Sequence, residues 1–266
     1  MHASSVMDMF HSYVAIGDSF TEGVGDELPD GRVRGWADFV ALGLAKAAGA
    51  GQMTYANLAI RGRKLGPLID EQLAPAIAMQ PELLSINGGG NDIMRPRVAI
   101  ASIARQLDDA VEAAVSAGIH VLLLSGANPS AHLPLGSLIR RRGEQLAVAV
   151  RAHYPRDGVT FVDNWADQTL EDIRYWSPDK LHLGPLGHVR VASNVLHALG
   201  VPVPAEWGVD AVADEAAGAH PRNSAAYYRQ YVIPWIGRRL TRRSSGDGRT
   251  AKIATLQPVN AESIVF

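Results

Sequence analysis

The sequence predicts an α/β protein built around one parallel sheet, and two observations predict it. Short runs that are apolar throughout recur along roughly residues 12–200, and segments with helical periodicity separate them. Strands that are apolar on both faces are typical of parallel sheets covered by helices on each side. Right-handed crossovers between such strands give a doubly wound arrangement, with helices above and below the sheet.

The elements follow one another in a regular order along the chain. Apolar runs predict five strands, at residues 13–16, 53–60, 82–86, 120–124 and 159–162. Helical spacing predicts helices at residues 35–48, 65–79, 98–117, 138–153 and 184–199. In the second helix we expect Pro67 and Pro75 to limit the ends or introduce a kink, because proline lacks the N–H that a helix needs.

The composition excludes several kinds of site. The 266 residues include no cysteine, which excludes disulfides, thiolate metal sites and a cysteine nucleophile. A formal net charge of −2 gives no reason to expect a nucleic-acid partner. The N-terminus lacks the basic and apolar regions of a secretory signal peptide, and no apolar run reaches the length of about 18 residues that spans a bilayer. We therefore expect a cytoplasmic location.

Four short stretches carry the polar residues best suited to catalysis. They are GDSFTEG (17–23), NLAIRGRKL (57–65), NGGGND (87–92) and WSPDKLHLGPLGH (176–188). The first three follow predicted strands, and the fourth precedes the last predicted helix. Functional residues of open parallel sheets lie beyond the carboxyl ends of the strands, so we expect these stretches along one rim. Taken singly, each has an ordinary interpretation as a turn, a loop or a helix cap.

The order and spacing of these stretches resemble the SGNH (GDSL-type) hydrolase family, whose name refers to an essential Ser, Gly, Asn and His. The resemblance covers roughly residues 12–200. It implies a flavodoxin-like, three-layer sandwich with a five-stranded parallel sheet, which we assign to a hydrolase domain of residues 1–205. It also implies hydrolysis of esters through an acyl-enzyme on a serine.

The chemistry of ester hydrolysis gives each residue of the set a role. Ser19 is the expected nucleophile, since a serine hydroxyl attacks a carbonyl once a base removes its proton. His182 is the expected base, and Asp179, three residues earlier, is expected to orient its ring. The backbone N–H groups of Ser19 and Gly62 and the side-chain amide of Asn91 are the expected donors of the oxyanion hole.

Two further acidic residues are expected to support these loops. Asp18 is expected to anchor the nucleophile loop through hydrogen bonds, and Asp92 to hold the loop that presents Asn91. We predict no metal and no cofactor, because the sequence contains no zinc-protease pattern, no phosphate-binding P-loop and no complete dinucleotide fingerprint. The absence of a G-x-S-x-G motif argues against the common α/β-hydrolase fold.

Residues 206–266 form a C-terminal extension of different character. From Arg222 to Lys252 it carries eight basic residues against one acid, Asp247. Three interpretations stay open. The extension is a solvated and partly disordered tail, it packs on the hydrolase domain through its tyrosines and Trp235, or it makes weak contact with an anionic membrane surface.

The sequence as a whole predicts a serine-dependent esterase or lipase whose partner is a small-molecule or lipid acyl ester. Two alternatives use the same residues: transfer of the acyl group to an acceptor other than water, and removal of acetyl groups from a carbohydrate. A further alternative is a non-catalytic binding protein on the same fold. The intact Ser, Gly, Asn and Asp–His set argues against it, since a scaffold would have no need of that set.

Overall fold

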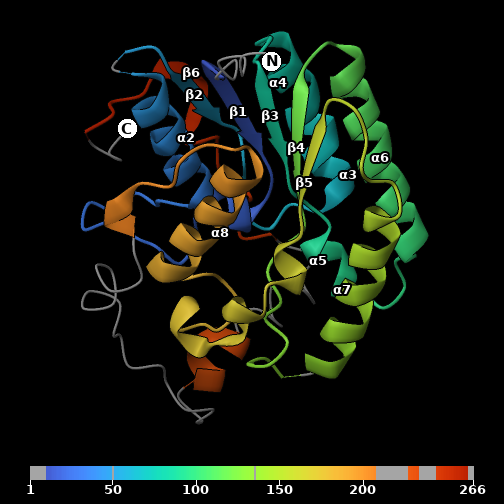
Figure 1. Ribbon diagram of the computed structural model, residues 1–266. Coiled ribbons are helices and arrows are strands. Elements are labelled where there is room, and N and C mark those ends of the chain that lie inside the picture. Colours follow the sequence, from blue (N-terminus) through green and yellow to red (C-terminus); the bar gives the residue numbers. More distant parts are fainter. Residues whose placement is uncertain (1–9, 50, 135, 208–226, 234–243, 263–266) are drawn as a thin grey trace, which may run out of the picture.

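The computed structural model describes residues 10–49, 51–134, 136–207, 227–233 and 244–262. Over these residues the chain forms one sheet of six strands in the order β5-β4-β3-β1-β2-β6 (Figure 1). The strands are β1 (Ser12–Ile16), β2 (Thr54–Asn57), β3 (Leu83–Ile86), β4 (His120–Leu124), β5 (Val159–Val162) and β6 (Ile253–Pro258). The α/β class predicted from the sequence is therefore confirmed.

The first five strands run parallel, as the alternation of strands and helices predicts. β1 lies between β2 and β3, with Val14 opposite Ala56 on one side and Leu84 on the other. The prediction of five strands is wrong by one, because β6 pairs antiparallel with β2 at the edge of the sheet. Only Ile253 among its residues is buried, so the segment lacks the continuous apolar run of a buried parallel strand.

Helices cover both faces of the sheet. On one face lie α2 (Trp36–Ala48) and α8 (Pro185–Ala198), which pack against each other. On the other lie α3 (Leu65–Leu68), α4 (Ala74–Ala78), α6 (Ile100–Ser116) and α7 (Gly136–Arg151). Each face has its own apolar core, with Trp36 and Val195 in the first and Ile16 and Val111 in the second. The result is the three-layer sandwich that the sequence predicts.

Shorter helices connect these layers and carry the polar stretches. They are α1 (Ser19–Glu22) and α5 (Gly90–Ile93), the 3-10 turns Asn164–Ala166, Gln168–Glu171, Ile173–Tyr175 and Ala205–Trp207, and the π turns Ile69–Leu73 and Tyr228–Val232. The predicted helix at 65–79 is real but irregular. A π turn joins α3 to α4 just before Pro75, whose missing N–H interrupts the regular hydrogen-bond ladder.

The C-terminal extension is described only in part. Trp235 and most of the basic residues lie outside the described residues, so the predicted membrane contact stays a prediction. In the described part, Tyr227 is buried and β6 continues the sheet. None of the helices in the described ranges has both the length and the apolar character needed to cross a bilayer.

Candidate active site

The polar stretches lie at the carboxyl ends of neighbouring strands. Ser19 opens α1, three residues after β1 ends at Ile16. Gly62 follows β2, and Asn91 lies in α5, which begins four residues after β3. Because β2, β1 and β3 are adjacent in the sheet, their loops share one rim. The sheet order thus brings together segments that lie far apart in the sequence.

His182 links the Ser19 hydroxyl to the Asp179 carboxylate. Its Nε2 lies 3.0 Å from Ser19 Oγ, and its Nδ1 lies 2.6 Å from Asp179 Oδ2. A carboxylate only accepts, so Nδ1 carries the proton and Nε2 is free to accept from the Ser19 hydroxyl. This is the geometry of a serine nucleophile with its base and the group that orients the base.

The loop that carries Asp179 fixes its carboxylate. Asp179 Oδ1 accepts from the backbone N–H groups of Leu181 and His182, each at 2.9 Å. It also accepts from the Ser177 hydroxyl at 2.7 Å. These three bonds leave Oδ2 for the imidazole. A short D-x-x-H segment can therefore place acid and base together without help from a regular helix.

The electrostatics of the pair oppose the effect of burial. Burial lowers the pKa of His182, but the charge and hydrogen bond of Asp179 and the charge of Asp18 outweigh it and raise that pKa above its ordinary value. For Asp179, burial acts to raise the pKa, and the charge and hydrogen bond of His182 hold it well below its usual range. Asp179 is thus ionised and stabilises a proton on the imidazole.

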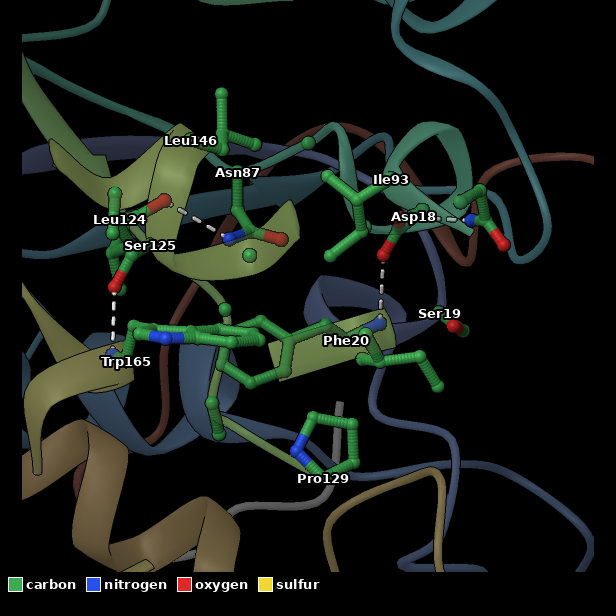
Figure 2. Close-up of a pocket in the computed structure, with 18 of the residues that line it drawn as sticks. Asp18, Ser19, Phe20, Asn87, Ile93, Leu124, Ser125, Pro129, Leu146 and Trp165 are labelled. Atoms are coloured by element: carbon green, nitrogen blue, oxygen red, sulfur yellow. Dashed lines mark hydrogen bonds between the residues drawn. The ribbon is translucent and has the colours of Figure 1, made fainter. Parts of the chain in front are cut away.

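Asp18 hydrogen-bonds within the loop after β1 and across to α5. Its Oδ1 accepts from Phe20 N–H at 3.1 Å and caps α1 (Figure 2). Its Oδ2 accepts from the Asn91 side chain at 3.0 Å. Burial raises the pKa of Asp18 to about 6. The two hydrogen bonds of the Asp18 carboxylate link the loop after β1 to α5, the helix after β3.

The predicted oxyanion donors differ in their availability. Among the hydrogen bonds of the described residues, the N–H groups of Ser19 and Gly62 have no protein acceptor. Gly62 has a φ of 75°, a conformation that glycine adopts without strain. Asn91 differs, because its Nδ2 donates to Asp18 Oδ2 and to the Arg63 carbonyl, both at 3.0 Å. Asn91 therefore links two of the site's loops in this structure.

Asp92 holds a different loop from the one expected. Its Oδ2 accepts from the Leu65 N–H at 2.9 Å, at the start of α3. Burial raises its pKa. Asp92 thus fixes the segment that follows Gly62, while its neighbour Asn91 fixes Arg63.

An apolar cavity of about 140 Å³ opens beside Ser19 and His182. It extends from Phe20 and Ile93 towards Leu146 and Trp165, between α7 and the end of β4 (Figure 2). Its polar lining includes Asn87, whose side-chain amide donates to the Leu124 carbonyl at 3.0 Å. The remaining surface is mostly hydrocarbon. The cavity therefore suits an alkyl or aryl group next to the nucleophile.

Two contacts that the sequence does not predict shape the site. The Glu22 carboxylate accepts from Arg61 N–H at 2.6 Å and from the Arg61 guanidinium at 2.8 and 2.6 Å. This pair joins the end of α1 to the residue before Gly62. His188 is fully buried and accepts from Trp36 N–H through Nδ1 at 3.2 Å. No local pattern marks these contacts, because each partner lies in a different sequence stretch.

The described part of the chain shows no ligand set for a metal. Within the described ranges, no three His, Asp or Glu side chains gather in an arrangement that could hold an ion. The acids around Ser19 are engaged instead with backbone N–H groups, Asn91 and His182. The groups present are those of nucleophilic acyl transfer.

Comparison with known proteins agrees with this chemistry. The sequence matches the GDSL-like Lipase/Acylhydrolase family over residues 15–190. A search of curated proteins gave no match. Among solved structures, the chain is similar to the lipase Lip_vut3 from a goat rumen metagenome, with a TM-score of 0.60 and 18% identity, covering 71% of this chain and 97% of that chain.

Two other structures show the same fold. One is a catalytic mutant of Axe2, an acetylxylan esterase from Geobacillus stearothermophilus, with a TM-score of 0.60, 19% identity, and coverage of 72% of this chain and 95% of that chain. The other is a lipase/acylhydrolase from Enterococcus faecalis, with a TM-score of 0.56, 18% identity, and coverage of 73% and 98%. Because residues 15–190 make up more than half of the sequence, the chain belongs to the GDSL-like lipase/acylhydrolase family of ester hydrolases.

Proposed function

We propose that this protein hydrolyses carboxylic esters through a covalent acyl-enzyme on Ser19. The observation that carries the proposal is the hydrogen-bonded series from Ser19 Oγ through His182 to Asp179, at 3.0 and 2.6 Å. Serine is a weak nucleophile until a base takes its proton. The raised pKa of His182 and the ionised Asp179 suit a base that holds this proton during the reaction.

The reaction proceeds in two halves. Ser19 Oγ attacks the ester carbonyl carbon while its proton passes to His182 Nε2, and the tetrahedral intermediate carries its negative charge on the former carbonyl oxygen. His182 then gives the proton to the alcohol oxygen, the C–O bond breaks, and the acyl group remains on Ser19. In the second half water attacks, His182 again takes and returns the proton, and the carboxylic acid leaves.

The oxyanion is held by backbone N–H groups. Ser19 and Gly62 each offer an N–H without a protein acceptor in the described part of the chain, which supports this role. Asn91 serves as a third donor when one of its two present bonds is exchanged for the oxyanion. Loss of one such donor typically costs about a hundred- to a thousandfold in turnover.

The cavity beside Ser19 receives the acyl group in this proposal. A closed apolar cavity of about 150 Å³ holds one benzene molecule. The cavity here measures about 140 Å³, so we expect it to hold an acyl chain of about six carbons. Each methylene buried there contributes about 0.8 kcal/mol, which favours such chains over acetate.

Hydrolysis of p-nitrophenyl esters from acetate to palmitate tests this function, with Ser19→Ala as the control. We expect a rate that disappears in Ser19→Ala and a kcat/KM that peaks near the hexanoate. A rate that Ser19→Ala leaves intact would refute the nucleophile. A peak at acetate would favour the removal of acetyl groups, and ester products formed with an added alcohol would favour acyl transfer.

A matched pair of variants on α7 tests the place of the acyl chain. Ala147 is buried and lines the cavity, whereas its neighbour Val148 is half exposed and does not. Ala147→Leu should narrow the cavity and move the optimum towards shorter esters, while Val148→Leu leaves the profile as it is. An unchanged profile in Ala147→Leu would show that the chain binds elsewhere.

A further inference from the structure

The C-terminal extension reaches the active site from outside the family match, which ends at residue 190. Pairing of β6 with β2 brings the extension beside the strand that leads into the Gly62 loop (Figure 1). In sequence the two segments lie almost 200 residues apart, with Asn57 opposite Ile253. The residues just before β6 then lie against the loops that carry the oxyanion donors.

The turn 244–248 packs directly on the Gly62 loop. A Cβ at Gly62 would lie 2.5 Å from Ser244 Oγ and 2.7 Å from Ser245 Oγ, so no larger residue fits there unless the turn shifts. A Cβ at Gly246 would lie 2.2 Å from the Arg61 carbonyl oxygen. A hydrogen bond within the turn stabilises its conformation, since Asp247 Oδ2 accepts from the Ser244 N–H at 2.8 Å. It is therefore a close-fitting support under residues 61–62.

Lys252, which follows this turn, contacts the end of α1, the helix that carries the second expected oxyanion donor, Ser19 N–H. Its Nζ donates to the Glu22 carbonyl at 2.7 Å, to the Val33 carbonyl at 3.3 Å and to Asp38 Oδ2 at 2.6 Å. Glu22 is the last residue of α1, the helix that begins at Ser19. All three donor positions of the ammonium are thus used, and two of them hold backbone oxygens.

These contacts join the two backbone donors through one network. The Glu22 side chain binds the N–H and the guanidinium of Arg61, next to Gly62, while its carbonyl binds Lys252. Asp38, which is 2% exposed, accepts from Lys252, from Gly35 N–H at 2.6 Å and from Tyr55 Oη at 3.1 Å. Lys252 is therefore the cation that this buried carboxylate needs.

We propose that Lys252 and the turn 244–248 position the N–H groups of Ser19 and Gly62 for the oxyanion. Lys252 is a positioning residue, since it acts through Glu22 and Arg61 and touches no reacting atom. The inference rests on the proposed ester hydrolysis. A donor displaced by about 1 Å from its working position can cost about a hundredfold in rate, and the loss falls on the transition state.

Kinetics of Lys252→Met test the proposal, with Lys46→Met as the matched control. Lys46 also pairs with a carboxylate, Glu206, but on the exposed surface. We expect kcat for p-nitrophenyl hexanoate to fall about ten- to a hundredfold in Lys252→Met with KM nearly unchanged. We expect the Ki of a hexyl trifluoromethyl ketone, which forms an oxyanion on Ser19, to rise by the same factor. Lys46→Met should change none of these values.

A second variant separates positioning from folding. Lys252→Met leaves the Asp38 carboxylate buried without its cation, so we expect the melting temperature of this variant to fall. The double variant Lys252→Met/Asp38→Asn removes both charges, so it should keep the melting temperature closer to that of the wild type and still lose kcat. Lys252→Arg, which restores a cation, should recover part of the rate.

The outcomes are distinct. A lowered melting temperature with unchanged kcat and Ki in the folded variants would overturn the proposal and leave the extension a purely stabilising element. A rise in KM without loss of kcat would overturn it as well, because it would show a role in binding the ground state. A wild-type rate no greater than that of Ser19→Ala would refute the proposed function itself, and this inference with it.

Discussion

His182 and His188 lie six residues apart, yet their environments shift their pKa values in opposite directions. His188 is fully buried and His182 is partly buried. His182 faces the carboxylates of Asp179 and Asp18, and its pKa is raised in spite of burial. Within the described residues, the hydrogen bonds of His188 go to backbone groups: it accepts from Trp36 N–H and donates to the Val24 carbonyl at 3.3 Å. Burial lowers the pKa of His188 to about 3.

The comparison teaches that partners, more than burial, decide what a histidine can do. A ring that must take a proton during catalysis needs a negative charge to stabilise its cationic form. A ring that only links two backbone segments is best kept neutral, with one nitrogen accepting and the other donating. In the proposed mechanism His182 performs the first task. His188 has the environment for the second, and its hydrogen bonds link α2 to the loop after α1.

Removal of each ring gives the largest expected contrast. His182→Ala takes away the base, so we expect kcat to fall by about 10⁴-fold or more. His188→Asn keeps an acceptor for the Trp36 N–H, and we expect its folded fraction to retain kcat within about tenfold. Steady-state kinetics on p-nitrophenyl hexanoate, corrected for folded protein, would measure both. Similar losses of kcat in His182→Ala and His188→Asn would contradict the different roles assigned to the two histidines.

The partner of His182 provides the next contrast. In Asp179→Ala the imidazole loses its orienting bond but remains able to take the Ser19 proton, so we expect a loss of about 10²- to 10⁴-fold, smaller than that of His182→Ala. The same kinetic assay compares the two. Equal losses would mean that the ring cannot act without its carboxylate.

Much of this site could be predicted from the sequence because its parts are local. Short apolar runs mark the strands, and the stretches around Ser19, Gly62, Asn91 and Asp179 follow or precede regular elements. The rest depends on pairing between distant segments. Lys252 and Asp38 are separated by 214 positions and Arg61 and Glu22 by 39, and nothing in either stretch indicates its partner.

The strand β6 and the side chain of Asn91 also depend on partners from distant parts of the sequence. Most residues of β6 are exposed, so its sequence does not indicate a strand, and the strand depends on pairing with β2. The orientation of the Asn91 side chain is set by its hydrogen-bond partners, Asp18 and the Arg63 carbonyl. The order of the motifs in the sequence does not identify these partners. Sequence patterns thus predict which residues meet at the rim, while the atoms they bind require the folded structure.

The pH dependence of activity sharpens the comparison further. His182 must be neutral to act as a base, so kcat/KM should rise with pH through a pKa above its ordinary value of about 6.5. Asp179→Asn removes the negative charge of Asp179, and burial, which lowers the pKa of His182, then has a larger share in setting that pKa. The rise in kcat/KM should therefore move to lower pH. A profile that stays in place, or moves to higher pH, would contradict this source of the shift.

The smallest expected effect concerns stability in acid. The folded pKa of His188, about 3, lies below the value of about 6.5 expected in the unfolded chain. The unfolded state therefore binds more protons below that upper value, and the free energy of unfolding falls as the pH drops from there towards 3. His188→Asn removes this contribution.

Urea unfolding of the wild type and His188→Asn between pH 7 and pH 4 would measure that effect. We expect the variant to be less stable at neutral pH but to lose less stability on acidification. Parallel curves for the two proteins would show that His188 is protonated in the folded state or titrates equally in both states.

Reaction with a p-nitrophenyl phosphonate, followed by peptide mapping, tests the central claim most directly. We expect a single adduct on Ser19 that forms at least about a thousandfold more slowly in His182→Ala and at a nearly unchanged rate in His188→Asn. An adduct on another residue, or equal rates in the wild type and His182→Ala, would contradict the claim that His182 activates Ser19.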